Sequence, residues 1–127
     1  ASLEYAAEHL HAPLLLVMGH EACGAVRAAI DTPATSSLGV NLDFMLKAIR
    51  PSVAATASAP AETRLRDAIL RNVEDTINEL LTDSPILKHA AGSGALGLIG
   101  GYYELATGRV HFSELVLPPP GAGAVHR

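Results

Sequence analysis

The sequence of 127 residues predicts an α/β domain in which a mostly parallel central sheet is flanked by helices and ends in a C-terminal antiparallel edge hairpin. Three observations lead to this prediction. Residues 14–18 form an unbroken apolar run of strand length, and a helical pattern follows. Residues 61–81 carry apolar side chains at helical spacing. Residues 96–105 form a second apolar run, which a glycine-containing turn connects to residues 110–115.

The first elements are helix, strand and helix. Ser2 is the expected N-cap of a short helix that Pro13 stops. The run 14–18 contains no polar residue, so we expect a central parallel strand covered on both faces. Gly19 is expected to end this strand, and residues 22–30 to form a helix directly after it.

The middle of the chain predicts two further helices. Residues 38–49 have a helical pattern that Pro51 is expected to end, with a loop over residues 52–60. Residues 61–81 are expected to form a long helix with an apolar stripe made of Leu65, Ala68, Ile69, Val73, Ile77 and Leu80.

The last third predicts a short helix and the edge hairpin. Ser84 and Pro85 are a suitable N-cap and first-turn residue for that helix. The strand at residues 96–105 pairs back with residues 110–115. Residues 1–117 are therefore expected to form the domain, and the Pro/Gly-rich residues 118–127 a flexible tail.

The composition excludes several classes of protein. With 49% hydrophobic residues the chain can bury a core, and its net charge of −4 is spread without a basic stripe for nucleic acid. No apolar run reaches the roughly 20 residues of a membrane span. The single cysteine, Cys23, excludes an internal disulfide and favours a reducing compartment, so we expect a cytoplasmic protein.

The segment GHEACG at residues 19–24 carries the candidate chemistry. His20 and Cys23 are three residues apart on a turn that enters a helix, so both side chains can converge on one ion. An imidazole nitrogen and a thiolate are typical zinc ligands. The glycine that follows, Gly24, leaves its backbone N–H open to an anion or a small substrate.

Taken alone, this pair has an ordinary alternative interpretation. A His and a Cys three apart also occur by chance, and a free Cys is often a small buried hydrophobe.

Three other patterns in the sequence are explained by structure and not by function. The GSGALG segment at residues 92–97 follows a helix rather than a strand, which argues against dinucleotide binding. Asn72 is expected to bond to backbone in the core, and the acidic residues of the long helix to form a solvated face: Glu74, Asp75, Glu79 and Asp83.

Several blocks together resemble the β-class carbonic anhydrases. They are SLEYA at residues 2–6, GHEACGAV at 19–26, Asn72-Val73, SPIL at 84–87 and LIGGYYEL at 98–105. They occur in the family's order and cover nearly all of residues 2–115. The resemblance implies the β-carbonic anhydrase fold and a homodimer or larger homo-oligomer.

The resemblance also implies a zinc enzyme that reversibly hydrates carbon dioxide to bicarbonate and a proton through zinc-bound hydroxide. It makes His20 and Cys23 two of three zinc ligands and gives Gly24 a role in holding substrate. The family's third ligand and its catalytic Asp–Arg pair belong to a Cys-x-Asp-x-Arg segment that would precede Ala1, so none of these can be assigned to a residue of this sequence. We therefore expect the chain to be part of a longer protein.

Two alternatives stay open on the sequence. One is a related hydrolase that acts on carbon disulfide or carbonyl sulfide. The other is a non-catalytic homologue that serves as a binding or assembly module.

Overall fold

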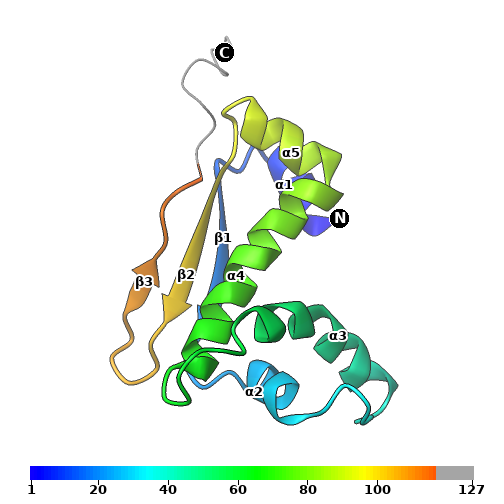
Figure 1. Cartoon of the computed structure of the whole chain (residues 1–127). Coiled ribbons are helices and arrows are strands. Elements are labelled where there is room, and N and C mark those ends of the chain that lie inside the picture. The colour runs from blue at the N-terminus through cyan, green and yellow to red at the C-terminus, as the bar shows by residue number, and fades with distance from the viewer. Residues whose placement is uncertain (117–127) are drawn as a thin grey trace.

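The computed structural model describes residues 1–116. These residues form helices and strands in the order that the sequence predicts (Figure 1). The predicted tail at residues 118–127 lies outside the described part of the chain. The elements are α1 (Ser2–Glu8), β1 (Leu14–His20), α2 (Gly24–Asp31), α3 (Val40–Ala55), α4 (Arg64–Asp83), α5 (Pro85–Gly92), β2 (Gly97–Tyr103) and β3 (Val110–Phe112).

The sheet has the strand order β1-β2-β3. Strands β1 and β2 are parallel, with Leu15 opposite Leu98, and β3 pairs antiparallel to β2, with Phe112 opposite Gly101. The predicted parallel sheet with an antiparallel edge hairpin is therefore confirmed. Helix α4 crosses one face of the sheet, while α1 and α5 lie at the amino end of β1 and α2 and α3 at its carboxyl end (Figure 1).

The predicted stripe of α4 is the centre of the core. Its middle residues Ala68, Ile69, Val73 and Ile77 are buried. One group of buried side chains lies between α4, α5 and the sheet, and a second joins α2, α3 and the first half of α4. Helix α4 thus belongs to both groups and connects the sheet to the two helices at its carboxyl end.

Helix α4 approaches the sheet closely at two glycines. A Cβ atom on Gly19 would lie 2.7 Å from Ile69 Cγ2 and 3.0 Å from Val73 Cγ2. A Cβ atom on Gly100 would lie 2.9 Å from Val73 Cγ1. Such distances are too short for a methyl group in a close-packed interior, so these glycines allow the helix to reach the strands.

The prediction that β1 is a central strand covered on both faces is wrong for the described residues. Strand β1 lies at the edge of the sheet. Its outward side chains Leu14, Leu16 and Met18 are 53%, 44% and 51% exposed, whereas Leu15 is buried under α4. An uninterrupted apolar run shows that both faces are suited to burial, but it cannot show what covers each face.

Several helix ends differ from the prediction, among them those of α1 and α3. Helix α1 has Ala1, not Ser2, at its N-cap, and it ends at Glu8 before Pro13 is reached. Helix α3 continues past Pro51 to Ala55. Pro51 removes one helical N–H donor, but Ser52 and Val53 in the following turn are buried, and that packing stabilises the last turn against the local cost. The expected loop at residues 52–60 therefore begins later.

Other local predictions are confirmed. Ser84 Oγ accepts a hydrogen bond from the Leu87 N–H at 3.2 Å, and Pro85 occupies the first turn of α5. Gly108, in the turn between β2 and β3, has a φ of 71°, a left-handed conformation that suits glycine. Residues 92–97 lead from α5 into β2, the reverse of the order that a dinucleotide site requires.

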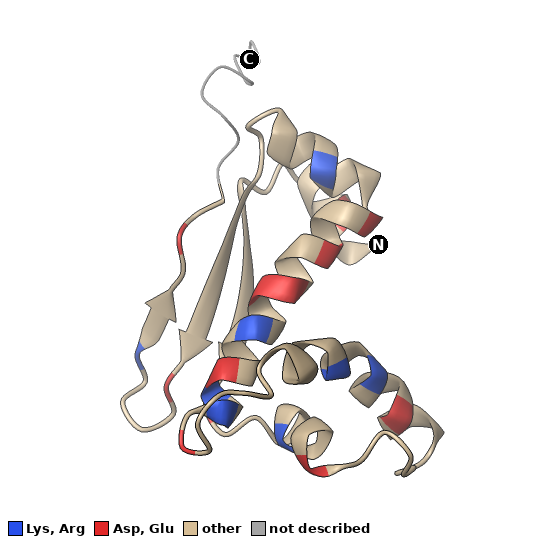
Figure 2. Ribbon diagram, in the orientation of Figure 1, with Lys and Arg blue, Asp and Glu red and all other residues tan. Residues whose placement is uncertain are grey.

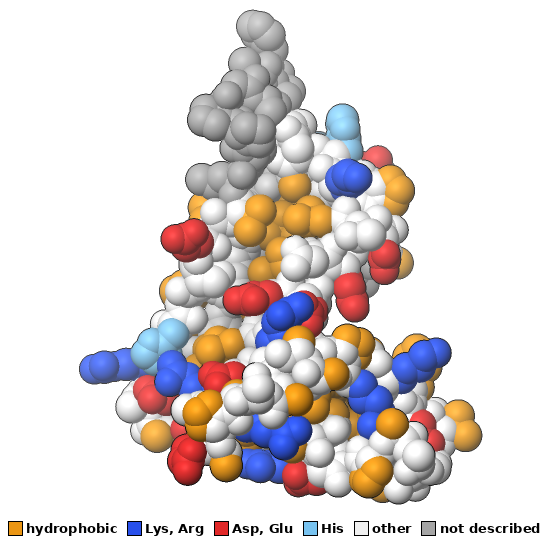
Figure 3. Space-filling view, viewed as in Figure 1, with side chains coloured by type: hydrophobic (Ala, Val, Ile, Leu, Met, Phe, Trp, Pro, Cys, Tyr) orange, Lys and Arg blue, Asp and Glu red, His pale blue; other side chains and the backbone are white. Residues whose placement is uncertain are grey.

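Charged side chains of both signs are interspersed on the helices, and β1 and β2 carry none (Figure 2). The space-filling view likewise shows acidic and basic groups scattered among hydrophobic ones over the visible face (Figure 3). Within residues 1–116, no helix is both long enough and apolar enough to cross a lipid bilayer.

Candidate metal centre

The two candidate metal ligands lie where β1 gives way to α2. His20 is the last residue of β1, and Cys23 is the N-cap of α2. His20 is opposite Tyr103, the last residue of β2, so this turn lies at the carboxyl end of the parallel pair. Ligand sites in open α/β sheets form at this end of the strands.

The His20 ring is held by a backbone contact that leaves one nitrogen free. Its Nδ1 lies 3.0 Å from the carbonyl oxygen of Glu21. A carbonyl oxygen can only accept a hydrogen bond, so Nδ1 carries the hydrogen and donates it. In the neutral ring Nε2 then keeps its lone pair, and His20 is exposed. This is the arrangement that a metal-ligating imidazole requires.

The Cys23 thiol stands at the beginning of a helix and is half-buried. Its side chain makes no capping hydrogen bond, and it packs against the core group that contains Val26 and Ala29. The N-terminus of α2 favours negative charge, which suits a thiolate ligand. Gly24 begins the helix, and an added Cβ there would meet no atom within 4 Å, so the space beside its backbone is open.

The turn between the two ligands contains a strained residue. Ala22 has a φ of 55°, in the left-handed region that costs an L-residue on the order of 1–2 kcal/mol. Because this conformation is not helical, α2 begins at Gly24 and not at Ala22, where the sequence pattern placed it. Strain of this kind persists only where surrounding contacts hold it.

Those contacts come from Glu21, which sequence reasoning did not single out. Its backbone N–H donates to the Tyr103 carbonyl at 2.8 Å. Its carboxylate Oε2 accepts from the N–H groups of Leu105 and Ala106 at 2.8 and 3.2 Å. The partners are more than 80 positions away along the chain, so no local spacing could have revealed them.

Tyr102 of β2 is buried, and its pKa is affected by the Glu21 carboxylate. Tyr102 faces the core and Tyr103 the other side of β2, because successive side chains of a strand point to opposite faces. Burial raises the pKa of Tyr102, and the carboxylates of Glu21 and Glu104 raise it further against the opposing effect of Arg66. The Arg66 guanidinium lies over the Tyr102 ring, 5.6 Å from its centroid.

His20 and Cys23 are residue types that commonly bind zinc. A neutral imidazole with a free Nε2 and a cysteine at a helix N-terminus are ligands that zinc accepts. Three protein ligands are usual for a catalytic zinc, yet within residues 1–116 no three His, Cys, Asp or Glu side chains form a group that could hold a metal. His20 and Cys23 alone are therefore fewer than the three protein ligands that a catalytic zinc usually has.

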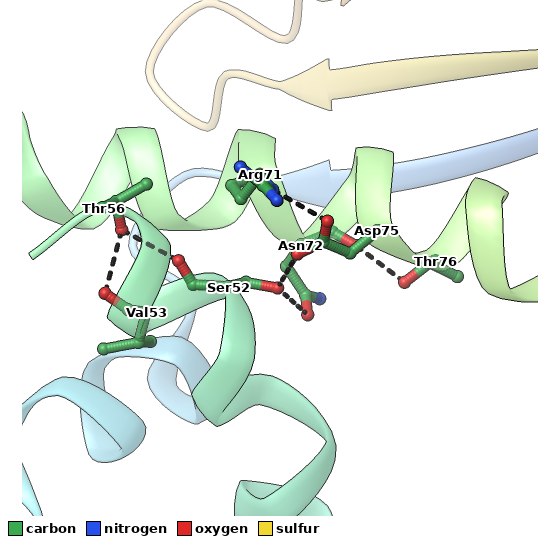
Figure 4. Close-up of polar contacts among 7 residues, drawn as sticks. All are labelled: Ser52, Val53, Thr56, Arg71, Asn72, Asp75 and Thr76. Atoms are coloured by element: carbon green, nitrogen blue, oxygen red, sulfur yellow. Dashed lines mark hydrogen bonds and ion pairs between the residues drawn. The ribbon is translucent and has the colours of Figure 1, made fainter.

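A separate groove of about 520 Å³ lies between α3 and α4. Its wall includes a polar cluster that links the two helices (Figure 4). Buried Ser52 donates its hydroxyl hydrogen to Asp75 Oδ2 at 2.7 Å, and Arg71 Nε donates to Asp75 Oδ1 at 2.7 Å. Neither His20 nor Cys23 lines this groove.

This cluster corrects two predictions. Asn72 was expected to bond to backbone, but its Oδ1 lies 3.4 Å from Ser52 Oγ. Asp75 was expected on a solvated face, but it is half-buried. Burial acts to raise its pKa, and the hydrogen bonds from Ser52 and Arg71 together with the Arg71 charge outweigh that effect, so the pKa of Asp75 lies below its usual value.

Comparison with known proteins identifies the family. A family model described as carbonic anhydrase matches residues 1–110. Carbonic anhydrase 2 of Mycobacterium tuberculosis is 31% identical over 109 residues, which cover 85% of this chain and 52% of that protein. A carbonic anhydrase of Mycolicibacterium smegmatis is 32% identical over 112 residues, which cover 86% of this chain and 53% of that protein. The chain spans about half the length of these relatives.

Solved structures have the same fold. The Coccomyxa β-carbonic anhydrase, solved in complex with acetazolamide, matches 91% of this chain and 54% of its own with a TM-score of 0.77 and 25% identity. A tetrameric β-carbonic anhydrase of Sordaria macrospora matches 87% of this chain and 56% of its own with a TM-score of 0.75 and 24% identity. The family model, these relatives and the fold agree: the chain belongs to the carbonic anhydrase family and has the fold of its β class.

Proposed function

We propose that the protein reversibly hydrates carbon dioxide, forming bicarbonate and a proton, at a zinc ion held by His20 and Cys23. The observation that carries this proposal is the pair of donors at the end of β1, with the His20 Nε2 left free by the bond from Nδ1 to Glu21. The family match supports the reaction. The third protein ligand, in this proposal, is a cysteine outside the described residues.

The residues of this chain have distinct tasks. His20 Nε2 and Cys23 Sγ hold and orient the metal, and the Gly24 N–H donates to an oxygen of the substrate or product. A bound zinc ion supplies the Lewis acidity that makes water nucleophilic near neutral pH. The helix N-terminus that begins at Gly24 favours the negative charge that develops as carbon dioxide becomes bicarbonate.

We also propose that the protein forms a homo-oligomer. The exposed apolar side chains Leu14, Leu16 and Met18 on one face of β1 support association, because large apolar patches on soluble proteins commonly mark interaction surfaces. The Sordaria macrospora protein is described as tetrameric.

The test is to replace each donor in the encoded protein, including any residues that precede Ala1. Zinc per chain is measured by mass spectrometry, and carbon dioxide hydration by stopped-flow with a pH indicator. We expect about one zinc per wild-type chain, and a loss of zinc together with a fall in rate of at least about 100-fold for His20→Ala and Cys23→Ser. Serine is a good N-cap, so Cys23→Ser removes the thiolate while helix α2 keeps its beginning.

The matched control is His9→Ala. His9 is exposed and pairs with Glu8, away from the turn, so zinc content and rate should stay at the wild-type level. A wild-type protein without zinc would contradict the proposal. A protein that carries zinc but hydrates no carbon dioxide would also contradict it, and would favour the related hydrolase or the binding module.

A further inference from the structure

The backbone N–H, the backbone carbonyl and the carboxylate Oε2 of Glu21 all make hydrogen bonds around the turn between the two candidate ligands. Its N–H bonds to the Tyr103 carbonyl, its carbonyl accepts from His20 Nδ1, and its carboxylate accepts from the Leu105 and Ala106 N–H groups. One residue therefore joins the end of β1 to the end of β2 and to the connection between β2 and β3.

Among the hydrogen bonds of Glu21, the two that its carboxylate accepts are expected to be the strongest, because the carboxylate is charged. An ionised oxygen that accepts two backbone N–H groups makes charge-assisted hydrogen bonds, which exceed neutral ones in strength. The N–H groups of Leu105 and Ala106 belong to an exposed connection just after β2. The Glu21 side chain thus bonds the turn to backbone N–H groups that lie outside the candidate metal centre.

The turn that these contacts hold also carries the hydrogen-bond partner of the His20 ring, the Glu21 carbonyl. The Glu21 carbonyl can hold Nδ1–H only while the turn keeps its orientation, and the next residue, Ala22, stands in a left-handed conformation that needs support. When the turn is held, Nδ1 carries the hydrogen and Nε2 is available to a metal. When the turn relaxes, the Nδ1 hydrogen bond and the ring orientation are lost together.

We propose that Glu21 is a positioning residue: its carboxylate, through the turn, selects the Nδ1–H tautomer of His20 and aims Nε2 at the metal. The proposal rests on the proposed function for the identity of the metal, but its effect on the His20 ring exists without any metal. Residues that fix a ligand histidine in this way typically contribute about 10- to 100-fold in metal affinity.

Two variants separate the reach of this side chain from its charge. Glu21→Gln keeps an oxygen at the same distance, so it accepts the two N–H bonds without a charge. Glu21→Asp keeps the charge but is one methylene shorter, so it cannot reach both N–H groups with the turn in place. Glu21→Ala removes the contact entirely, and Glu62→Ala is the control, because Glu62 is exposed in the segment before α4.

The first measurement is made on metal-free protein, by the ¹⁵N chemical shifts of the His20 ring. The wild type, Glu21→Gln and Glu62→Ala should show the Nδ1–H tautomer. Glu21→Ala and Glu21→Asp should shift to the Nε2–H form or to a mixture of both. An unchanged Nδ1–H tautomer in Glu21→Ala, or in Glu21→Asp should the alanine variant not fold, would overturn the proposal.

The second measurement is metal affinity in the encoded protein, by chelator competition for zinc and by the absorption bands of bound cobalt(II). We expect zinc affinity to fall about 10- to 100-fold in Glu21→Ala and Glu21→Asp, with altered cobalt bands, and to stay within about 3-fold in Glu21→Gln. A Glu21→Gln variant as weak as Glu21→Ala would overturn the proposal. If the wild type binds no zinc, the proposed function fails, and the tautomer measurement still decides the role of Glu21.

Discussion

Gly24 offers a direct test of how the site holds its substrate. It is the first residue of α2, and the space around its backbone is open. Proline is well suited to this position because the first N–H of a helix has no partner within the helix. Cys23 before it has a ψ of 113°, close to the extended conformation that a residue before proline adopts. Gly24→Pro therefore deletes one N–H with little effect on the helix.

We expect Gly24→Pro to bind zinc normally and to hydrate carbon dioxide about 10- to 100-fold more slowly, the range for losing one hydrogen bond to a charged group. Gly24→Ala is the matched control, since it adds a side chain into open space and keeps the N–H. Stopped-flow rates and zinc content of both variants decide the matter. Equal rates for the proline and alanine variants would remove Gly24 from substrate binding.

At the scale of elements, the Ser52–Asp75 bond joins α3 to α4. Ser52 is 1% exposed and its hydroxyl lies 2.7 Å from Asp75 Oδ2, so both partners are held in place. We expect Ser52→Ala to lower the free energy of unfolding by about 1–2 kcal/mol near pH 7, because a carboxylate loses a buried donor. The exposed pair of Thr63 and Asp67 is the control, and Thr63→Ala should cost less than about 0.5 kcal/mol.

The effect of Ser52→Ala depends on pH, with a defined sign. The pKa of Asp75 is lowered from its usual 3.8 in the folded protein, so its contribution to stability is complete above that value. It is lost as the pH falls below 3.8 through the folded-state pKa, where Asp75 becomes protonated. Urea unfolding at a series of pH values should therefore show the difference between wild type and Ser52→Ala narrowing only below about pH 4. If the difference in unfolding free energy between wild type and Ser52→Ala stayed constant down to pH 2, this explanation would be wrong.

The elements that could be predicted from the sequence are those that local chemistry determines. The stripe of α4 and the Ser84 cap of α5 depend on residues within a few positions of one another. The continuation of α3 through Pro51 depends on burial of Ser52 and Val53 against α4, which no window around Pro51 contains. Local proline chemistry was outweighed there by tertiary packing.

The residues of the candidate metal centre likewise include some that the sequence could predict and one that it could not. His20, Cys23 and Gly24 could be proposed as site residues because they lie within five positions of one another in a strand-to-helix turn. Glu21 could not, since its partners lie in a connection that only the parallel pairing of β1 and β2 brings alongside. Strand pairing brings together residues that are far apart in the sequence, and the spacing of residues within one segment does not reveal such contacts.

At the scale of the whole molecule, the sheet is covered on one face only within the described residues. Leu16 and Met18 lie on its other face, and Phe112 of β3, opposite Gly101, lies there too and is 61% exposed. Among residues 1–116, no strand pairs with the outer edge of β1, and such an edge promotes association between chains.

We expect this chain to associate through that face. Sedimentation velocity over a range of protein concentrations should show species larger than a monomer, and Leu16→Lys should shift the distribution toward the monomer by placing a charge in the contact. Val40→Lys is the control, because Val40 is an apolar residue on α3 that is already 86% exposed. Equal association of both variants would exclude the sheet face as the contact.

The contact between α4 and the sheet restricts how the sequence can vary. Val73 covers two strands at once, with Cγ2 facing Gly19 of β1 and Cγ1 facing Gly100 of β2. Natural variants that keep this helix at this separation must keep hydrogen in place of a side chain at both positions, since either methyl group would meet the same valine. A smaller residue at position 73 alone would not relieve this crowding, because a Cβ atom on Gly19 would still lie 2.7 Å from Ile69 Cγ2 and one on Gly100 would still lie 2.9 Å from Ser113 Oγ. Replacement of either glycine is therefore expected to require compensating changes at more than one of its neighbours.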